Sequence, residues 1–191
     1  MLLDFAAYSQ NEKNLVTRIR TYNWPKLLKL WRNIKAGNST GWNSGKALEY
    51  MLVRAFDLNA AEVVYPYRNS VLDADEQMDG YVFIKDVGAG FLLECKDWSK
   101  SVSFDEVAKL HGRLTYRPAF TYGMFVSKEG YTPSAMNLMY SLHPHNILLW
   151  SFGDIDECFK HHKFVKALKY KLQYAMITAD LNIAVLDGIN I

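Results

Sequence analysis

Apolar residues recur at helical spacing in the first third of the chain. Between residues 14 and 34 they alternate with basic residues at intervals of three or four, which is typical of amphipathic helices. Pro25 divides this stretch, since proline starts helices better than it continues them. A polar, glycine-rich loop follows at residues 37–45, and Lys46 to Leu58 returns to the amphipathic pattern. We therefore expect two short helices, a loop and a third helix.

The rest of the chain alternates apolar runs typical of strands with amphipathic stretches. We expect the strands at residues 61–67, 81–85, 91–96, 122–127 and 147–152. We expect the later helices at residues 104–116, from Pro133 onward, and at 154–178 as one long helix. Residues 86–90 form the predicted turn of a hairpin, and Ser103 with Glu106 has the spacing of a capping box for the helix that follows. This order predicts an α/β fold, a central mixed β-sheet flanked by helices on both faces.

Composition narrows the class of protein. The chain has 191 residues, of which 50% are hydrophobic and 14% aromatic, and this richness excludes intrinsic disorder. No apolar run approaches about 18 residues, so we expect no membrane span. The first residues lack the basic and apolar regions of a signal peptide. Cys95 and Cys158 lie far apart and form no disulfide framework, so we expect a cytoplasmic protein.

Charge is distributed unevenly along the chain. The net charge is +2, yet residues 1–48 hold eight lysines and arginines against two acids, so the remainder is net acidic. A basic arm on an acidic body suggests a polyanionic partner. The predicted contacts are Arg18, Arg20, Lys29 and Arg32. Two alternatives remain open: a solvated helix face, and an arm that packs against a partner chain.

Candidate chemistry lies in the second half of the hairpin. Residues two apart on a strand point to the same face, so Glu94 and Lys96 project side by side. Charges on an apolar strand are costly unless they are paired or bind a metal. With Lys85 opposite Gly90, the hairpin register would place Asp79 opposite Lys96. Read singly, Asp79-Gly80 could be only a turn, and Lys96 only a surface lysine.

Two converging carboxylates make an oxygen site suited to Mg²⁺, which prefers hard ligands and keeps several waters. Asp79 and Glu94 are the predicted metal ligands, with the backbone carbonyl of Cys95 as a third. Lys96 beside such a metal could activate a water and stabilise negative charge, as phosphodiester hydrolysis requires. The neighbouring histidines His161 and His162 lack zinc-site spacing, so we expect no zinc.

The series Glu49, Asp79 and Glu94-Cys95-Lys96 resembles the PD-(D/E)xK nuclease superfamily, with Met78 in place of the proline. The closer resemblance is to Mrr-like restriction endonuclease-like proteins, and it covers roughly Lys46 to Trp150. The motifs that carry it follow in order at residues 78–80, 94–96, 102–112, 123–127 and 130–135. Each motif is weak alone, and their order and spacing together are fairly specific.

The resemblance implies a restriction endonuclease-like core that cuts DNA with a divalent metal. It implies Asp79 and Glu94 as metal ligands, Lys96 as the catalytic lysine and Glu49 as an outer acid. We therefore expect a DNA endonuclease with a restriction or DNA-processing role, dependent on Mg²⁺ with Mn²⁺ as a substitute. The expected organisation is a basic helical N-terminal extension, residues 1–45, on a nuclease domain, residues 46–191, in one compact unit.

Two other functions fit the same residues. One is a nucleic-acid-binding protein of this fold that cuts nothing, and the presence of all three residues of the motif argues against it. The other is a Holliday-junction-resolvase-like protein, which would act as a dimer on branched DNA. A homodimer or a partner subunit is therefore an open expectation.

Overall fold

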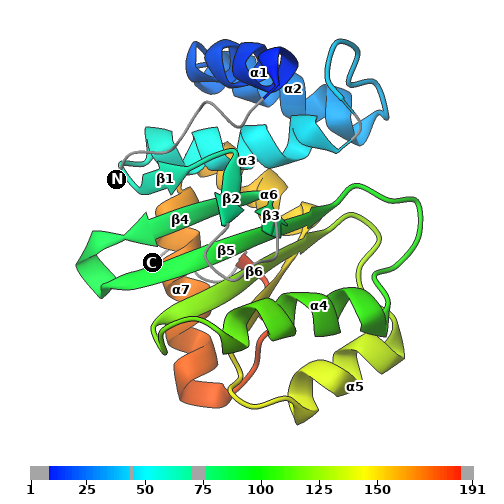
Figure 1. Cartoon of the computed structure of the whole chain (residues 1–191), viewed down its shortest axis with the longest axis vertical. Helices are drawn as coiled ribbons and strands as arrows, with labels where there is room; N and C mark the ends of the chain where they lie inside the picture. The colour runs from blue at the N-terminus through cyan, green and yellow to red at the C-terminus, as the bar shows by residue number, and fades with distance from the viewer. Residues whose placement is uncertain (1–8, 44, 70–75, 186–191) are drawn as a thin grey trace.

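The computed structural model describes residues 9–43, 45–69 and 76–185. Its centre is a five-stranded sheet in the order β1-β4-β5-β6-β7 (Figure 1). These strands span Glu62–Val64, Gly80–Ile84, Ala89–Lys96, Thr121–Ser127 and Ile147–Ser151, respectively. A separate two-stranded sheet pairs β2 (Tyr67–Asn69) with β3 (Glu76–Met78).

The large sheet is mixed, as predicted. β1 and β4 pair antiparallel, β4 and β5 form the antiparallel hairpin, and β5, β6 and β7 run parallel. Parallel neighbours need a crossover connection, and α4 (Phe104–Thr115) and α5 (Pro133–Ser141) supply the two crossovers. β5 therefore lies at the centre of the sheet, between an antiparallel and a parallel neighbour.

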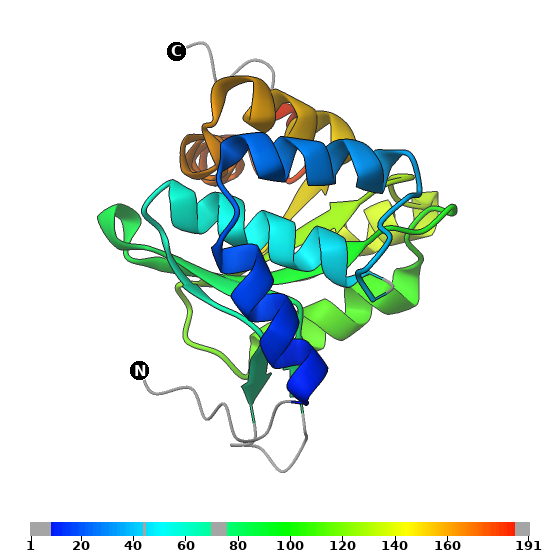
Figure 2. The same cartoon turned by 90° about the horizontal axis from the view of Figure 1, so that it is seen from above.

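Helices cover both faces of the sheet (Figures 1 and 2). On one face lie α3 (Lys46–Leu58), α6 (Phe152–His161) and α7 (Phe164–Thr178). α4 and α5 cover the other face. α1 (Gln10–Arg20) and α2 (Trp24–Lys35) pack on the outside of α3, so the N-terminal helices add a further layer.

The two N-terminal helices begin where side-chain caps are available, and the prediction of two helices is confirmed. Ser9 and Glu12 form a capping box at α1, and the Asn23 side chain accepts from the N–H of Lys26 at α2. Pro25 lies in the first turn of α2, where its missing N–H costs little. Ile19 is among the fully buried side chains that join these helices to the core.

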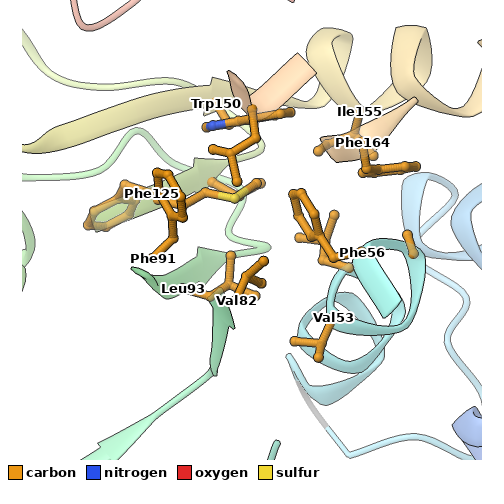
Figure 3. Close-up of a cluster of buried hydrophobic side chains, with 14 of the residues drawn as sticks. Val53, Phe56, Val82, Phe91, Leu93, Phe125, Trp150, Ile155 and Phe164 are labelled. Atoms are coloured by element: carbon orange, nitrogen blue, oxygen red, sulfur yellow. The ribbon is translucent and has the colours of Figure 1, made fainter. Parts of the chain in front are cut away.

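The core includes buried apolar side chains on both faces of the sheet, and Figure 3 draws part of it. Side chains from β4 and β5 meet those of α3, α6 and α7 there. Figure 3 labels Val53, Phe56, Val82, Phe91, Leu93, Phe125, Trp150, Ile155 and Phe164. Because Leu93 points into this core, Glu94 next to it in the strand points to the α4 face.

A buried lysine anchors the segment that follows α7. Lys171 is 1% exposed, and its Nζ donates to the carbonyl of Leu149 on β7 at 2.7 Å and to the carbonyl of Ile183. Asp154 is its charge partner at 3.1 Å, and the same carboxylate accepts from the N–H of Val185. Burial lowers the pKa of Lys171, against the opposing effect of Asp154.

Several predicted boundaries are wrong. The long helix expected at 154–178 is two helices, because His162 takes a left-handed conformation (φ 53°) and ends α6. The run expected as one strand at 61–67 contributes to two different sheets. The expected last strand ends at Ser151, whose side chain caps α6.

The predicted hairpin register is shifted by two residues. A short 3₁₀ turn at Lys85–Val87, closed by Gly88 at φ 62°, makes the connection, and Phe83 rather than Lys85 lies opposite Gly90. This register brings Asp79 level with Glu94 instead of Lys96. Because the shift is even, Asp79 stays on the face that carries both residues.

In the part of the chain that the structure describes, no helix combines the length and the apolar composition needed to cross a bilayer.

Candidate active site

Asp79 lies at the junction of β3 and β4, half-buried, beside the edge of β5. Its Oδ2 accepts a hydrogen bond from the N–H of Cys95 at 2.7 Å. Gly80, which follows it, has no room for a side chain, since a Cβ there would lie 2.5 Å from Cγ2 of Val53. The close approach of this strand to α3 therefore fixes where the Asp79 carboxylate sits. Burial raises the pKa of Asp79 well above its usual range, and the negative charges of Glu49 and Glu94 raise it further.

Glu94 and Lys96 lie side by side near the end of β5. Lys96 Nζ is 2.7 Å from Glu94 Oε1, and both side chains are largely buried. Burial disfavours the charged lysine, but Glu94 and Glu106 outweigh it and raise the pKa of the Lys96 ammonium. Lys96 is therefore a protonated lysine held against the sheet.

The crossover helix α4 supplies two partners for this pair. Arg113 Nη1 is 2.9 Å from Glu94 Oε2, and Glu106 Oε2 is 3.0 Å from Lys96 Nζ. The predicted capping box at Ser103 does not form: no side-chain hydrogen bond caps this end of α4. The reason is that the Glu106 carboxylate pairs with Lys96 and Lys109 instead.

Sequence reasoning missed both α4 partners. The signal was available: Glu106 and Arg113 are seven residues apart, which places them on one face of a helix. This helix is the next element after the strand that carries Glu94 and Lys96. Glu106 of the helix therefore pairs with Lys96, and Arg113 pairs with Glu94.

Glu49 approaches from the opposite layer. It lies in the first turn of α3, buried, and forms an ion pair with Lys46. Burial raises its pKa, while Lys46 and a hydrogen bond with the Asp79 side chain lower it in part. The negative charge of Glu94 thus raises the pKa of both Glu49 and Asp79 at this end of the sheet.

The donor set suits a hard divalent cation. Asp79 and Glu94 offer carboxylate oxygens. Burial, and then repulsion by Glu49 and Glu94, raises the pKa of Asp79, and a bound cation would offset that repulsion. Among residues 9–43, 45–69 and 76–185, no group of three or more His, Cys, Asp and Glu side chains has the arrangement of a complete metal site. Two carboxylates would leave several positions to water, which is the usual habit of Mg²⁺.

Only two of the four predicted basic contacts line a common cleft. Arg18 and Lys29 line a common cleft with Trp42, whereas Arg20 and Arg32 lie outside it. Arg18 is held within the protein, because Nη1 donates to the carbonyl of Gly41 at 2.8 Å and its guanidinium stacks 4.5 Å from the Trp42 ring centroid. Arg32 is an exposed residue in the last turn of α2.

A mixed sheet with helices on both faces, and with carboxylates and a lysine at the end of its central strand, is a restriction endonuclease-like fold. The family model Mrr_cat, described as a restriction endonuclease, matches residues 43–159, which is more than half of the chain. The chain belongs to this family.

Solved structures resemble the chain at low sequence identity. The crystal structure of a protein of unknown function, AF1548, has a TM-score of 0.46 at 13% identity and covers 56% of this chain and 57% of its own. The DNA modification-dependent restriction endonuclease AspBHI has a TM-score of 0.39 at 17% identity, covering 81% of this chain and 37% of its own.

The MspJI restriction endonuclease in complex with a 27-mer oligonucleotide has a TM-score of 0.41 at 15% identity, covering 100% of this chain and 43% of its own. The chain thus spans less than two thirds of the length of each of these structures. No curated protein matches it.

Proposed function

We propose that the protein is a metal-dependent DNA endonuclease with a restriction or DNA-processing role. The observation that carries this proposal is the position of three side chains at the end of β5. The Lys96 ammonium lies 2.7 Å from the Glu94 carboxylate, and the N–H of Cys95, between them in the strand, holds the Asp79 carboxylate. Membership of a restriction endonuclease family supports it. We propose that residues 1–45 form a basic helical extension on a nuclease domain of residues 46–191. The extension would supply positive charge for a polyanionic substrate.

Asp79 and Glu94, with the backbone carbonyl of Cys95, would hold Mg²⁺ or Mn²⁺. Such an ion, when bound, supplies a Lewis acid and lowers the pKa of its water. Glu49 would act from behind Asp79, through the effect of its negative charge on the Asp79 carboxyl. The Glu49 charge raises the pKa of Asp79, and a bound cation would replace the proton that Asp79 otherwise keeps.

Lys96 is placed to act on the reacting phosphate. Its ammonium is a donor that can orient the attacking water, and its positive charge favours the extra negative charge of the transition state. Glu94 and Glu106 keep it protonated, so it supplies positive charge and is not a general base at neutral pH.

The test is plasmid cleavage with Mg²⁺, comparing the wild type with Lys96→Ala and with a matched control, Lys85→Ala. Lys85 is an exposed lysine at the other end of the same hairpin, paired with Glu62. We expect Lys96→Ala to lose at least about 100-fold in turnover, as the loss of a transition-state donor does, while the control cuts like the wild type. DNA binding without cleavage by the wild type, across Mg²⁺ and Mn²⁺, would instead support a non-cleaving binding protein.

A further inference from the structure

A cleft of about 360 Å³ opens between α1, α2 and the loop before α3. We call it the basic cleft. Its lining includes Arg18, Tyr22, Lys26, Lys29, Thr40 and Trp42. None of the described residues that line it is acidic. The cleft therefore combines positive charge with two aromatic rings.

The aromatic side of the basic cleft is held in place by Arg18. The guanidinium stacks on Trp42 and its Nε donates to the Tyr22 hydroxyl at 3.1 Å. The Tyr22 and Trp42 rings meet edge to face at 6.2 Å. Because Arg18 is engaged with these groups and with Gly41, it fixes the rings rather than reaching out to a ligand.

The cationic side consists of Lys26 and Lys29. They are three residues apart on α2, so they project from the same face of the helix, and both are exposed. Lys26 Nζ lies 5.8 Å from the centroid of the Tyr22 ring. By contrast Arg32 and Lys35, further along α2, lie outside the cleft, and Lys35 pairs with Asp156.

The N-terminal end of α3 links the basic cleft to Glu49 of the candidate active site. The Trp42 and Tyr50 rings meet edge to face with their centroids 6.2 Å apart, and Tyr50 follows Glu49 in α3. The loop that carries Trp42 leads into that helix, and a Cβ at Gly45 would lie 3.5 Å from Oε1 of Glu49. Trp42 of the cleft and Glu49 of the candidate site therefore lie at the same end of α3.

We propose that the basic cleft holds one nucleotide of the DNA strand, with its phosphate at Lys26 and Lys29 and its base against Tyr22 and Trp42. Single strands are bound by this pairing of a positive groove with aromatic rings. The volume is at the lower end of ligand pockets, which begin at about 300 Å³. The inference rests on the proposed nuclease function and adds a position for the substrate strand beyond the reacting phosphate.

The first test measures binding of a short thymidine oligonucleotide in EDTA, so that no cleavage occurs. Lys26→Gln/Lys29→Gln should bind about tenfold or more weakly, with a salt slope flatter by about 0.7 for each lost phosphate contact. The matched control is Lys85→Gln/Lys160→Gln, which removes the same charge from two exposed lysines outside the basic cleft. Equal losses in the two double variants would overturn the proposal, since they would reflect net charge alone.

The second test separates the base from the phosphate. A deoxyribose-phosphate oligomer of the same length, which lacks bases, should bind the wild type about tenfold more weakly than the thymidine oligonucleotide. In Trp42→Leu, checked for an unchanged melting temperature, the two probes should bind alike. Equal binding of the two probes by the wild type would overturn the role of the rings. The Lys26→Gln/Lys29→Gln variant keeps Trp42, so it tests the cleft even if Trp42→Leu fails to fold.

Two further outcomes identify the source of the nucleotide and separate this proposal from the nuclease itself. If thymidine monophosphate displaces the oligonucleotide at equal concentration, the cleft is a free-nucleotide site and the strand proposal is wrong. Binding that depends on Lys26 and Lys29 in a protein that never cuts DNA would retain the basic cleft and reject the nuclease. Cleavage with wild-type affinity in the Lys26/Lys29 variant would retain the nuclease and reject the cleft.

Discussion

Arg113 and Lys96 take one oxygen each of the same carboxylate: Arg113 Nη1 lies 2.9 Å from Glu94 Oε2, and Lys96 Nζ lies 2.7 Å from Oε1. Glu94 is 9% exposed, and these two ion pairs offset the cost of burying its carboxylate. A metal that binds Glu94 must therefore share the carboxylate with a cation or displace it.

Arg113→Gln should lower stability in EDTA by about 1–3 kcal/mol, because a buried carboxylate loses a charged hydrogen-bond partner. A saturating divalent cation should restore part of that loss, since it stabilises only the folded state to which it binds. Thermal unfolding with EDTA and with Mg²⁺ measures both effects, and Arg32→Gln controls for the loss of an exposed arginine. An unchanged melting temperature in EDTA would show that the ion pair contributes nothing.

Asp79→Asn should stabilise the metal-free protein at neutral and alkaline pH. Because the folded pKa of Asp79 is raised, mainly by burial, the folded state keeps a proton that the unfolded state has lost. The Asp79 carboxyl thus makes its full contribution to the free energy of unfolding below its unfolded pKa, about 3.9. That contribution is lost as pH rises through the folded pKa.

The Asp79→Asn variant removes that decline, and its amide oxygen can still accept from the Cys95 N–H. We expect a melting temperature higher by a few degrees at pH 8 in EDTA, where about 1 kcal/mol corresponds to about 2–4 °C. The variant should also gain nothing from Mg²⁺. A lower melting temperature than the wild type at pH 8 in EDTA would contradict the expected cost of this buried charge.

Glu106→Gln tests whether α4 positions Lys96. The substitution removes a negative partner 3.0 Å from Nζ, so the pKa of Lys96 should fall and the alkaline limb of the pH–rate profile should move to lower pH. We expect kcat/KM to fall about tenfold, which corresponds to about 1.4 kcal/mol. Lys109→Gln removes the other partner of Glu106 and should leave the profile in place; a shift in both variants would assign the effect to the helix as a whole.

Gly80→Ala should destabilise the protein by about 1–3 kcal/mol, the usual cost of an overpacked core. The new methyl group would lie 2.5 Å from Cγ2 of Val53, a short side chain that cannot move far within a helix. Val53→Ala in the same protein should recover much of the loss, and denaturant unfolding of the four proteins of this double-mutant cycle gives the coupling. Additive effects of the two substitutions would mean that no such contact forms.

Hydrophobic periodicity is sufficient to predict the strands of the hairpin and the elements after it, because the core buries one face of each strand and helix. It predicts no strand at Glu76–Met78, where β3 lies. It could not place the break at His162, where a residue other than glycine adopts a left-handed conformation. Nor could it end β1 at Val64, since the β-rich run continues to Tyr67 and only tertiary pairing assigns Tyr67 to a different sheet.

The spacing of Asp79, Glu94 and Lys96 identified residues that the structure brings to one end of the sheet, and their catalytic roles stay predictions. Local reasoning failed at Glu106. Its spacing from Ser103 fits a cap, yet two lysines offer this carboxylate stronger, charged partners. The missing information was which helix face meets the strand, and this depends on the crossover rather than on the local sequence.

The buried lysine between β7 and the segment after α7 has a consequence for local opening of the protein. An ammonium has three donors, and the carbonyls of Leu149 and Ile183 and the carboxylate of Asp154 accept all of them. Residues 181–185 cannot detach without leaving Lys171 short of a partner in an apolar interior. In hydrogen–deuterium exchange the Leu149 amide, bonded to the carbonyl of Leu181, should therefore become labile together with the Val185 amide, as one cooperative unit.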